Sequence, residues 1–370
     1  MSHKKVWYAP NKFESYGETE INAVEDCLRD GWLTGNGPRT EKFEKMVSEY
    51  FGKKYGLFVN SGSSAVLLAI ASLDLPVGTR IVTPACTFAT SVSPIVQLGM
   101  EPVFIDVELD TFVPSVESIK SVYKDGDVIL LPNLIGSKPD WKAIRKEFPS
   151  AILIEDSADT VTYTPWTDVS TTSFYSSHVV TAGGIGGMVM FNDEKHLKRA
   201  TMLRDWGRVG DNSERVDDRF NCEIDGIPYD WKFLYGGLGY HMKASEMNAA
   251  FGIVQWNRLD EILKQRSRVF KMLCKKFEKN YDTNLNWLAF PLIVENRLDV
   301  IKHLENNGIQ TRVCFAGNIT RHPAFRKYLQ AFPNSDRIME CGMLVGAHHG
   351  MTLEDVAHIW NVFSTLKRST

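Results

Sequence analysis

The sequence predicts an α/β protein with a mainly parallel central sheet and a smaller C-terminal α+β domain. Apolar, strand-like runs alternate with helical patterns over the first two-thirds of the chain, as in the crossover units of a parallel sheet. The pattern changes after Tyr240, where a long helical stretch covers 243–268. The 370 residues also exceed the roughly 250–300 at which one core stops growing. We therefore expect a large domain over residues 1–250 and a small one over 251–370.

The expected elements follow from the apolar pattern. In the first part, strands are expected at 55–60, 80–83, 102–107, 128–131, 151–155, 171–175 and 187–191, with helices at 63–73, 87–98, 113–123 and 138–148. The C-terminal part is expected to hold strands 287–294 and 310–315 and helices 298–306 and 353–366. The segment 207–239 is irregular and too long for a passive connector, so we expect it to contribute to a site.

Composition excludes several classes of function. The net charge of -3 gives no electrostatic footprint for nucleic-acid binding. No apolar run reaches the roughly 18–20 residues that span a bilayer, and the N-terminus has no apolar signal region, so we expect a cytoplasmic protein. The six cysteines form no CxxC pair, which predicts reduced thiols and neither a zinc site nor an iron–sulfur cluster.

Two candidate sites follow strands whose carboxyl ends should meet at one edge of the sheet. Asn60-Ser-Gly-Ser-Ser-Ala65 lies between a strand and a helix, where backbone N–H groups and hydroxyls can bind a phosphate; an ordinary helix cap is the alternative. Glu155-Asp-Ser-Ala-Asp159 ends a buried strand. A buried carboxylate needs a partner, which a protonated ring nitrogen of a cofactor or an internal salt bridge could supply.

Two further features follow strands. Phe88 closes the motif Pro84-Ala-Cys-Thr-Phe88 and could stack on a ring or belong to the core. His178 lies in a turn beside the glycine-rich run 183–187, where it is a candidate general base or a plain surface histidine. Glycines there would let the backbone approach a ligand closely.

Taken together, these motifs resemble the sugar-nucleotide aminotransferase family (DegT/DnrJ type), whose members depend on pyridoxal phosphate (PLP) and have fold type I. The resemblance covers nearly the whole chain. The motifs that carry it are Trp32-Leu-Thr-Gly-Asn-Gly37, Phe43-Glu44, Asn60-Ser-Gly-Ser-Ser64, Pro84–Phe88, Phe104-Ile-Asp106, Glu155-Asp156, Ser173-Phe-Tyr175 and Gly239-Tyr240.

One departure from the family decides the expected function. His178 stands where family aminotransferases have the lysine that bonds covalently to PLP, and no lysine occurs between Lys146 and Lys195. The histidine form resembles the branch of 3-dehydratases that act on NDP-4-keto-6-deoxyhexoses. Further matches to that branch are Arg204-Asp-Trp-Gly-Arg208, Tyr229-Asp-Trp-Lys232, Thr311–Asn318 and Asp336–Met339.

The resemblance implies roles at individual positions. Gly62, Ser63 and Ser64 are expected to bind the cofactor phosphate together with Ser173. Phe88 is expected to stack on the ring, Asp156 to hold the ring nitrogen protonated, and Asp159 to lie near the ring hydroxyl. His241 occupies the position of an asparagine that reaches across the family's dimer interface, so a homodimer is implied. His178 is expected to act as the base.

The implied activity is that of a lyase in deoxysugar biosynthesis. The cofactor is expected to be PLP or its amine form, pyridoxamine phosphate (PMP), bound non-covalently, with an amino-group donor such as glutamate. Only Cys222 follows the Asp-Trp-Gly-Arg motif closely, so no iron–sulfur cluster is expected, because a cluster needs four ligands. Two alternatives stay open: an unusual sugar-nucleotide aminotransferase or other PMP-dependent enzyme, and a non-catalytic family member that binds the cofactor.

Overall fold

The computed structural model describes residues 5–10, 12–210 and 215–366, and its centre is a seven-stranded sheet of order β1-β7-β6-β5-β4-β2-β3. The strands are β1 (Tyr55–Val59), β2 (Arg80–Pro84), β3 (Glu101–Ile105), β4 (Val128–Pro132), β5 (Ile152–Ser157), β6 (Val169–Ser173) and β7 (Gly187–Phe191). The pairs β2–β3, β2–β4, β4–β5 and β5–β6 are parallel. β7 runs antiparallel to both β1 and β6. The expected mainly parallel sheet is confirmed, and the seven expected strands are its members.

Helices cover both faces of this sheet, because successive strand residues point to opposite sides. Leu57 and Val59 of β1 pack into one apolar cluster and Phe58 into another. The helices of this part are α1 (Lys12–Ser15), α2 (Glu18–Asp30), α3 (Pro38–Phe51), α4 (Gly62–Ala71), α5 (Ala89–Gln97), α6 (Val116–Lys120), α7 (Trp141–Glu147) and α8 (Glu194–Arg204). The sequence predicted α4 to α7, with each helix shorter than expected; α2, α3 and α8 were not predicted.

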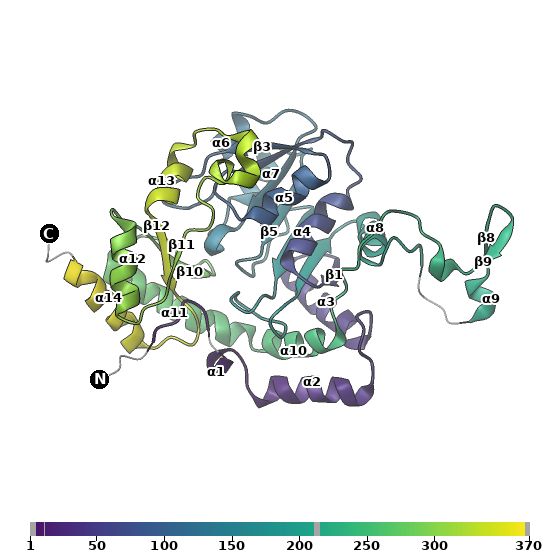
Figure 1. Cartoon of the computed structure of the whole chain (residues 1–370), viewed down its shortest axis with the longest axis horizontal. Coiled ribbons are helices and arrows are strands. Elements are labelled where there is room, and N and C mark those ends of the chain that lie inside the picture. The colour runs from purple at the N-terminus through teal and green to yellow at the C-terminus, as the bar shows by residue number, and fades with distance from the viewer. Residues whose placement is uncertain (1–4, 11, 211–214, 367–370) are drawn as a thin grey trace.

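A second, three-stranded sheet lies beside the first (Figure 1). Its strands are β10 (Ala289–Ile293), β11 (Thr311–Val313) and β12 (Gly342–Gly346), with β12 in the middle and antiparallel to both neighbours. Its helices are α12 (Arg297–Asn306), α13 (Pro333–Cys341) and α14 (Leu353–Leu366). The α+β pattern is confirmed, although β12 and α13 were not predicted.

The helical stretch expected at 243–268 is interrupted and extends beyond residue 268. It forms α10 (Glu246–Asn257) and α11 (Leu259–Phe277), separated at Arg258. The chain start also joins the second sheet, because the Val6 N–H donates to the Gly308 carbonyl at 2.9 Å. The domain boundary at residue 250 therefore stays a prediction that falls inside α10.

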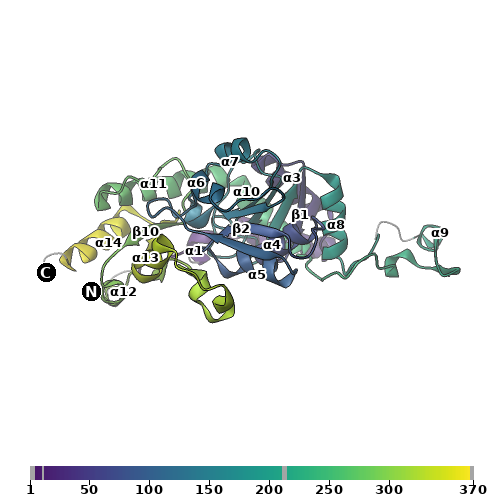
Figure 2. The ribbon, with the colours of Figure 1, turned by 90° about the horizontal axis from the view of Figure 1, so that it is seen from above.

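The segment 207–239 forms an arm that projects from the body of the molecule (Figures 1 and 2). Its described part contains α9 (Val216–Arg219) and a short hairpin of β8 (Cys222–Ile224) and β9 (Ile227–Tyr229). Apolar side chains on it face solvent: Leu238 is 97% exposed and Ile227 is 62% exposed. None of the helices in the described part of the chain has the length and apolar character that crossing a membrane requires.

Candidate active site

A cavity of about 370 Å³ lies at the carboxyl ends of the central strands. This is the edge at which ligands bind in open α/β sheets. The structure brings together seven of the residues that the sequence singled out: Gly62, Ser63, Phe88, Asp156, Asp159, Ser173 and His178 all line the cavity. No lysine is among the described residues that line it.

One end of the cavity is formed by the start of α4. Ser61 caps this helix and accepts a hydrogen bond from the Ser64 N–H at 3.1 Å. The N–H groups of Gly62 and Ser63 come first in the helix, so they have no carbonyl partner one turn earlier. Helix starts of this kind bind phosphate groups. The sequence prediction of an anion-binding turn fits this geometry.

Two glycines let neighbouring backbones close this end of the cavity. A Cβ on Gly62 would lie 2.7 Å from Ser173 Cβ, and a Cβ on Gly187 would lie 2.3 Å from the Ser61 carbonyl carbon. Both distances are shorter than van der Waals contact. The antiparallel strand β7 therefore presses against the start of α4, and the Ser173 hydroxyl lies beside the helix N-terminus.

The hydroxyls at this end differ in what they contact. Ser63 is exposed, and its hydroxyl donates to Thr90 Oγ1 at 2.9 Å. The Ser64 hydroxyl donates to Asn60 Oδ1 at 2.7 Å, and Ser64 is not among the lining side chains. A phosphate contact through the Ser63 hydroxyl needs this group to donate to the phosphate in place of Thr90. The expected contact through Ser64 stays a prediction.

Asp156 lies at the end of β5, where it is 6% exposed. Its carboxylate accepts hydrogen bonds from the Ser91 hydroxyl at 2.6 Å and from the Ala158 N–H at 3.2 Å. Burial raises the pKa of this carboxyl above its usual range, because an ionised group loses its hydration. No lysine or arginine is among the cavity's described lining residues. A protonated ring nitrogen would supply the charge that this buried carboxylate lacks.

The preceding residue, Glu155, points to the other face of β5 and has a different role. Its carboxylate accepts hydrogen bonds from Asn133 Nδ2 at 2.6 Å, the Thr164 hydroxyl at 2.9 Å and the Ser170 hydroxyl at 2.6 Å. These groups are buried and satisfy the carboxylate from within the fold. Of the two adjacent carboxylates, only Asp156 lines the cavity.

Asp159 follows β5, and its side chain lines the cavity. Its Oδ2 accepts the Ile135 N–H at 2.8 Å. Burial raises the pKa of Asp159 to about 7. Its Oδ1 lies 4.0 Å from Nε2 of His178.

His178 lies in the turn after β6, where its N–H donates to the Tyr175 carbonyl at 2.9 Å. The side chain is 18% exposed. Burial lowers the pKa of the imidazole to about 4, so the ring is neutral at pH 7. Within the described part of the chain, Nδ1 is buried without a hydrogen-bond partner. A neutral, incompletely partnered imidazole in a cavity can accept a proton from a bound ligand.

Two aromatic rings form the wall of the cavity that faces the second sheet. Phe88 caps α5 and is 54% exposed, although it lines the cavity. The ring of Phe315 meets it edge to face at 6.3 Å. The exposed ring of Phe88 is available for a planar ligand, and the expected stacking on the cofactor ring stays a prediction.

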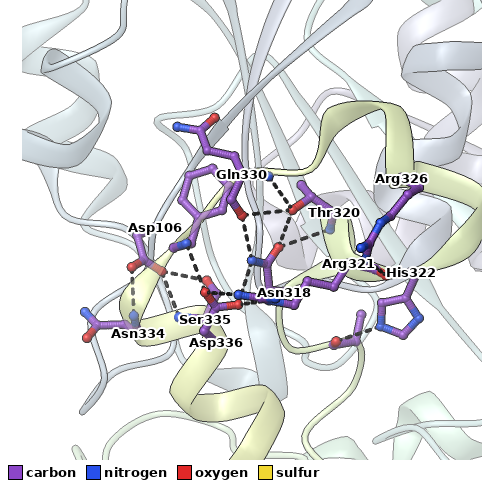
Figure 3. Close-up of polar contacts among 12 residues, drawn as sticks. Asp106, Asn318, Thr320, Arg321, His322, Arg326, Gln330, Asn334, Ser335 and Asp336 are labelled. Carbon is purple, nitrogen blue, oxygen red and sulfur yellow. Dashed lines mark hydrogen bonds and ion pairs between the residues drawn. The ribbon is translucent and has the colours of Figure 1, made fainter.

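A polar network holds the chain segment that follows Phe315 (Figure 3). Asp106, just after β3, accepts hydrogen bonds from the Ser335 N–H at 2.9 Å and the Ser335 hydroxyl at 2.6 Å. Asn318 Nδ2 donates to Asp336 Oδ1 at 2.8 Å. Arg321 pairs with Asp336 and lowers the pKa of that carboxyl. These hydrogen bonds link the segment that follows Phe315 to Asp106 at the end of β3, and so hold the aromatic wall of Phe88 and Phe315 in place.

His241 lies outside the cavity of its own chain. Its ring stacks on Trp206 at the base of the arm, with centroids 4.6 Å apart and an interplanar angle of 10°. The expectation that it reaches a neighbouring subunit's cofactor stays a prediction.

Sequence reasoning assigned no role in the site to several lining residues, among them Thr90, Ser91, Tyr175 and Phe315. Ser91 holds the Asp156 carboxylate, and Tyr175 lies 5.9 Å from His178 between ring centroids. Thr90 and Ser91 follow Phe88 closely, so their place at the start of a helix that begins at the cavity could have indicated them. Phe315 comes from a distant part of the chain, and its only indication was that it lies in the motif Thr311–Asn318, which resembles the 3-dehydratase branch.

The cavity fits the cofactor that the sequence predicts. One end offers helix N–H groups and hydroxyls for a phosphate, one wall offers an exposed aromatic ring, and Asp156 offers a buried carboxylate for a ring nitrogen. The absence of a Cβ at Gly62 lets Ser173 lie against the start of α4, and the Nδ1 atom of His178 has no hydrogen-bond partner in the described structure. No group of three or more His, Cys, Asp or Glu side chains that could hold a metal ion occurs among the described residues.

Comparisons with known proteins agree with this geometry. The model of the DegT/DnrJ/EryC1/StrS aminotransferase family matches residues 14–364. A lipopolysaccharide biosynthesis protein RfbH of Salmonella typhimurium is 31% identical over 94% of this chain and 89% of that protein. A dTDP-4-dehydro-2,6-dideoxy-D-glucose 3-dehydratase of Saccharopolyspora spinosa is 30% identical over 92% and 82%. The E. coli GDP-4-keto-6-deoxy-D-mannose-3-dehydratase with bound hydrated PLP has the same fold, with a TM-score of 0.85, 24% identity and coverage of 97% and 99%.

Proposed function

The chain belongs to the DegT/DnrJ/EryC1/StrS aminotransferase family, and we propose that it is a PLP/PMP-dependent 3-dehydratase that removes the C3 hydroxyl of an NDP-4-keto-6-deoxyhexose. Among its relatives, the Saccharopolyspora spinosa protein carries the name of a 3-dehydratase acting on a dTDP-linked ketosugar. The family is PLP-dependent, and the cavity has matching places for the phosphate, ring and ring nitrogen.

One observation carries the proposal: the cavity contains His178 and, among its described lining residues, no lysine. An aminotransferase needs an amine side chain that bonds to the cofactor and moves protons. An imidazole can move protons but forms no stable covalent bond of that kind. The site therefore supports proton transfer while the cofactor stays non-covalently bound.

When bound, PMP would supply an amine able to condense with the C4 ketone of the sugar and a ring able to accept an electron pair. The start of α4 and the Ser173 hydroxyl would hold its phosphate, and Phe88 would orient its ring. Asp156 would hold a proton on the ring nitrogen, which strengthens the ring as an electron acceptor. Nε2 of His178 would take the proton at C4′ of the cofactor, whose removal allows the C3 hydroxyl to leave. A positioned base of this type contributes roughly 10²–10⁴-fold to rate.

Product analysis tests the proposal. The holoenzyme is incubated with GDP-, CDP- and dTDP-linked 4-keto-6-deoxyhexoses plus glutamate, and the sugars are analysed by mass spectrometry and NMR. We expect loss of the C3 oxygen without nitrogen retained on the sugar. Nitrogen retained at C4 with the C3 hydroxyl intact would contradict the proposal and identify an aminotransferase, the activity that the family's description favours.

A non-catalytic role is the other alternative. It predicts cofactor binding without turnover of any of these sugars. The complete set of phosphate, ring and ring-nitrogen contacts favours an enzyme, because a site that has lost its reaction has no need of a buried carboxylate opposite the ring nitrogen.

We also propose that the amino group comes from a donor such as glutamate and that no iron–sulfur cluster takes part. Five of the six cysteines are buried and Cys222 is partly exposed. Turnover by purified protein with glutamate and without a reductase supports this, and a strict requirement for iron and a reductase contradicts it.

A homodimer and a cytoplasmic location belong to the same proposal. The arm presents apolar side chains to solvent, and exposed patches of this kind are typical of interaction surfaces. Sedimentation analysis should give about twice the mass of the 41.8 kDa chain, and a monomer at micromolar concentration would contradict the dimer. Cell fractionation tests the location.

A further inference from the structure

We propose that Asp159 is a positioning residue for His178, and that its carboxylate serves as the counter-charge facing Nε2 when the imidazole takes a proton. The catalytic meaning of this pair rests on the proposed function, whereas the pairing itself stands on geometry. Asp159 Oδ1 lies 4.0 Å from His178 Nε2, and both side chains line the same cavity.

The separation suits this role. At 4.0 Å the two atoms are within ion-pair distance but beyond the roughly 2.7–3.2 Å of a hydrogen bond. Nε2 is therefore not occupied by Asp159 and can still exchange a proton with a ligand. The carboxylate itself is anchored, because Oδ2 accepts the Ile135 N–H at 2.8 Å, which leaves Oδ1 turned toward the imidazole.

Burial makes such a counter-charge necessary. The imidazole alone resists protonation, since burial lowers the pKa of His178 to about 4. Burial also raises the pKa of Asp159 to about 7. At pH 7 the imidazole is therefore neutral and Asp159 is within its titration range, so ionisation of Asp159 places a negative charge 4.0 Å from Nε2. A proton that reaches Nε2 is then balanced by the ionised carboxylate.

Other charged or titratable groups face the pair, and they act in known directions. Arg266 of α11 disfavours protonation of His178, and Asp156 disfavours ionisation of Asp159. Tyr175 lies 5.9 Å from the imidazole. The charge of Asp159 also raises the pKa of Tyr8 and of Cys314, both of which are neutral at pH 7. Of these groups, only the carboxylates supply negative charge, and Asp159 is the one at ion-pair distance from Nε2.

Histidine NMR on the cofactor-free protein tests the pairing without substrate. Ring carbons of the nine histidines are labelled with ¹³C, and the His178 signal is assigned by its loss in His178→Asn. In the wild type, this signal should shift with a step near pH 7, because Asp159 titrates there. Asp159→Asn keeps the oxygen that accepts the Ile135 N–H and should abolish the step. Glu117→Gln, an exposed position on α6, is the matched control and should leave it unchanged.

Two results would overturn the pairing: a wild-type signal without a step near pH 7, or a step that persists in Asp159→Asn. If Asp159→Asn does not fold, Asp159→Glu decides, because moving the carboxylate by one carbon should displace the step, and an undisplaced step contradicts the pairing. These outcomes are independent of whether the enzyme dehydrates a sugar.

A kinetic measurement on the loaded enzyme then connects the pair to turnover. Asp159→Asn should lower kcat, by at most about tenfold for each unit by which the pKa of His178 falls. KM for the nucleotide sugar should stay nearly unchanged. Asp159→Glu should recover part of the loss. A pH–rate profile identical to that of the wild type would refute the role in catalysis.

Discussion

Replacing Asp156 with asparagine should change cofactor affinity and protein stability in opposite directions. The asparagine side chain can keep every hydrogen bond of the site: its oxygen replaces the one that accepts the Ala158 N–H, and the Ser91 hydroxyl can turn to accept from the new amide. The negative charge alone is lost. Because burial raises the pKa of Asp156, ionisation at pH 7 costs about 1.4 kcal/mol for each unit of that rise.

The cofactor-free Asp156→Asn protein should therefore be at least as stable as the wild type. Its affinity for PLP should fall, because a buried charge partner is typically worth about 2 kcal/mol or more, which is roughly 30-fold or more in Kd. Thermal unfolding of the cofactor-free protein and a spectroscopic titration with PLP, both at pH 7, measure the two effects.

Glu155→Gln is the matched control, since the side chain is adjacent but points away from the cavity. The glutamine oxygen can accept from Asn133 in place of Oε1, while the new amide faces the Ser170 hydroxyl, which must turn to accept from it. Because the buried donors lose their charged acceptor, the free energy of unfolding should fall by about 1–3 kcal/mol. PLP affinity should change little. If Asp156→Asn binds PLP within about threefold of the wild type, Asp156 does not face the ring nitrogen and the orientation proposed for the cofactor is wrong.

Four further predictions follow from the cavity. Gly62→Ala places a Cβ 2.7 Å from Ser173 Cβ, so overpacking should lower the free energy of unfolding by about 1–3 kcal/mol. Because the displaced Ser173 hydroxyl is expected to contact the phosphate, PLP binding should also weaken; unchanged affinity in a titration would contradict the phosphate assignment. Borohydride treatment of the holoenzyme should leave the cofactor removable by dialysis, and a lysine found labelled by mass spectrometry would contradict this. His178→Asn should bind the cofactor but make no product, and full activity in the product assay would contradict the assignment of His178 as the base. The pKa of Asp159 is about 7 in the folded protein and 3.8 in the unfolded chain. Its contribution to stability is therefore present below pH 4 and is lost as pH rises to 7, by about 4 kcal/mol at the upper limit. Chemical denaturation should show that Asp159→Asn lacks this loss, and the same dependence of unfolding free energy on pH in both proteins would contradict it.

Local sequence was sufficient to predict two segments that line the cavity. The run that ends in Glu155-Asp156 predicted carboxylates at a strand end, and the serine-rich turn at 60–65 predicted the start of a helix. Both depend only on residues adjacent in the chain. The strand order was not predictable in the same way, since β7 inserts between β1 and β6.

The direction of β7 could not be predicted from its connection. The links 158–168 and 174–186 both lack a helix, yet β6 runs parallel to β5 and β7 runs antiparallel to β6. β12 was missed because its apolar run, Gly342-Met-Leu-Val-Gly346, is short and flanked by glycines. Phe315 joins the cavity through contacts between distant segments, such as that of Asp106 with Ser335, which no local pattern encodes.

A cavity that anchors its coenzyme without a lysine is subject to mass action. A tethered coenzyme survives dilution, but one retained only by N–H groups, hydroxyls, a carboxylate and an aromatic face leaves whenever its free concentration falls below Kd. The fraction of working molecules, and the heat resistance that ligand binding adds, will therefore vary with the supply of vitamin B6 around the protein. Purification by gel filtration is expected to strip the coenzyme progressively, and adding it back should restore what was lost.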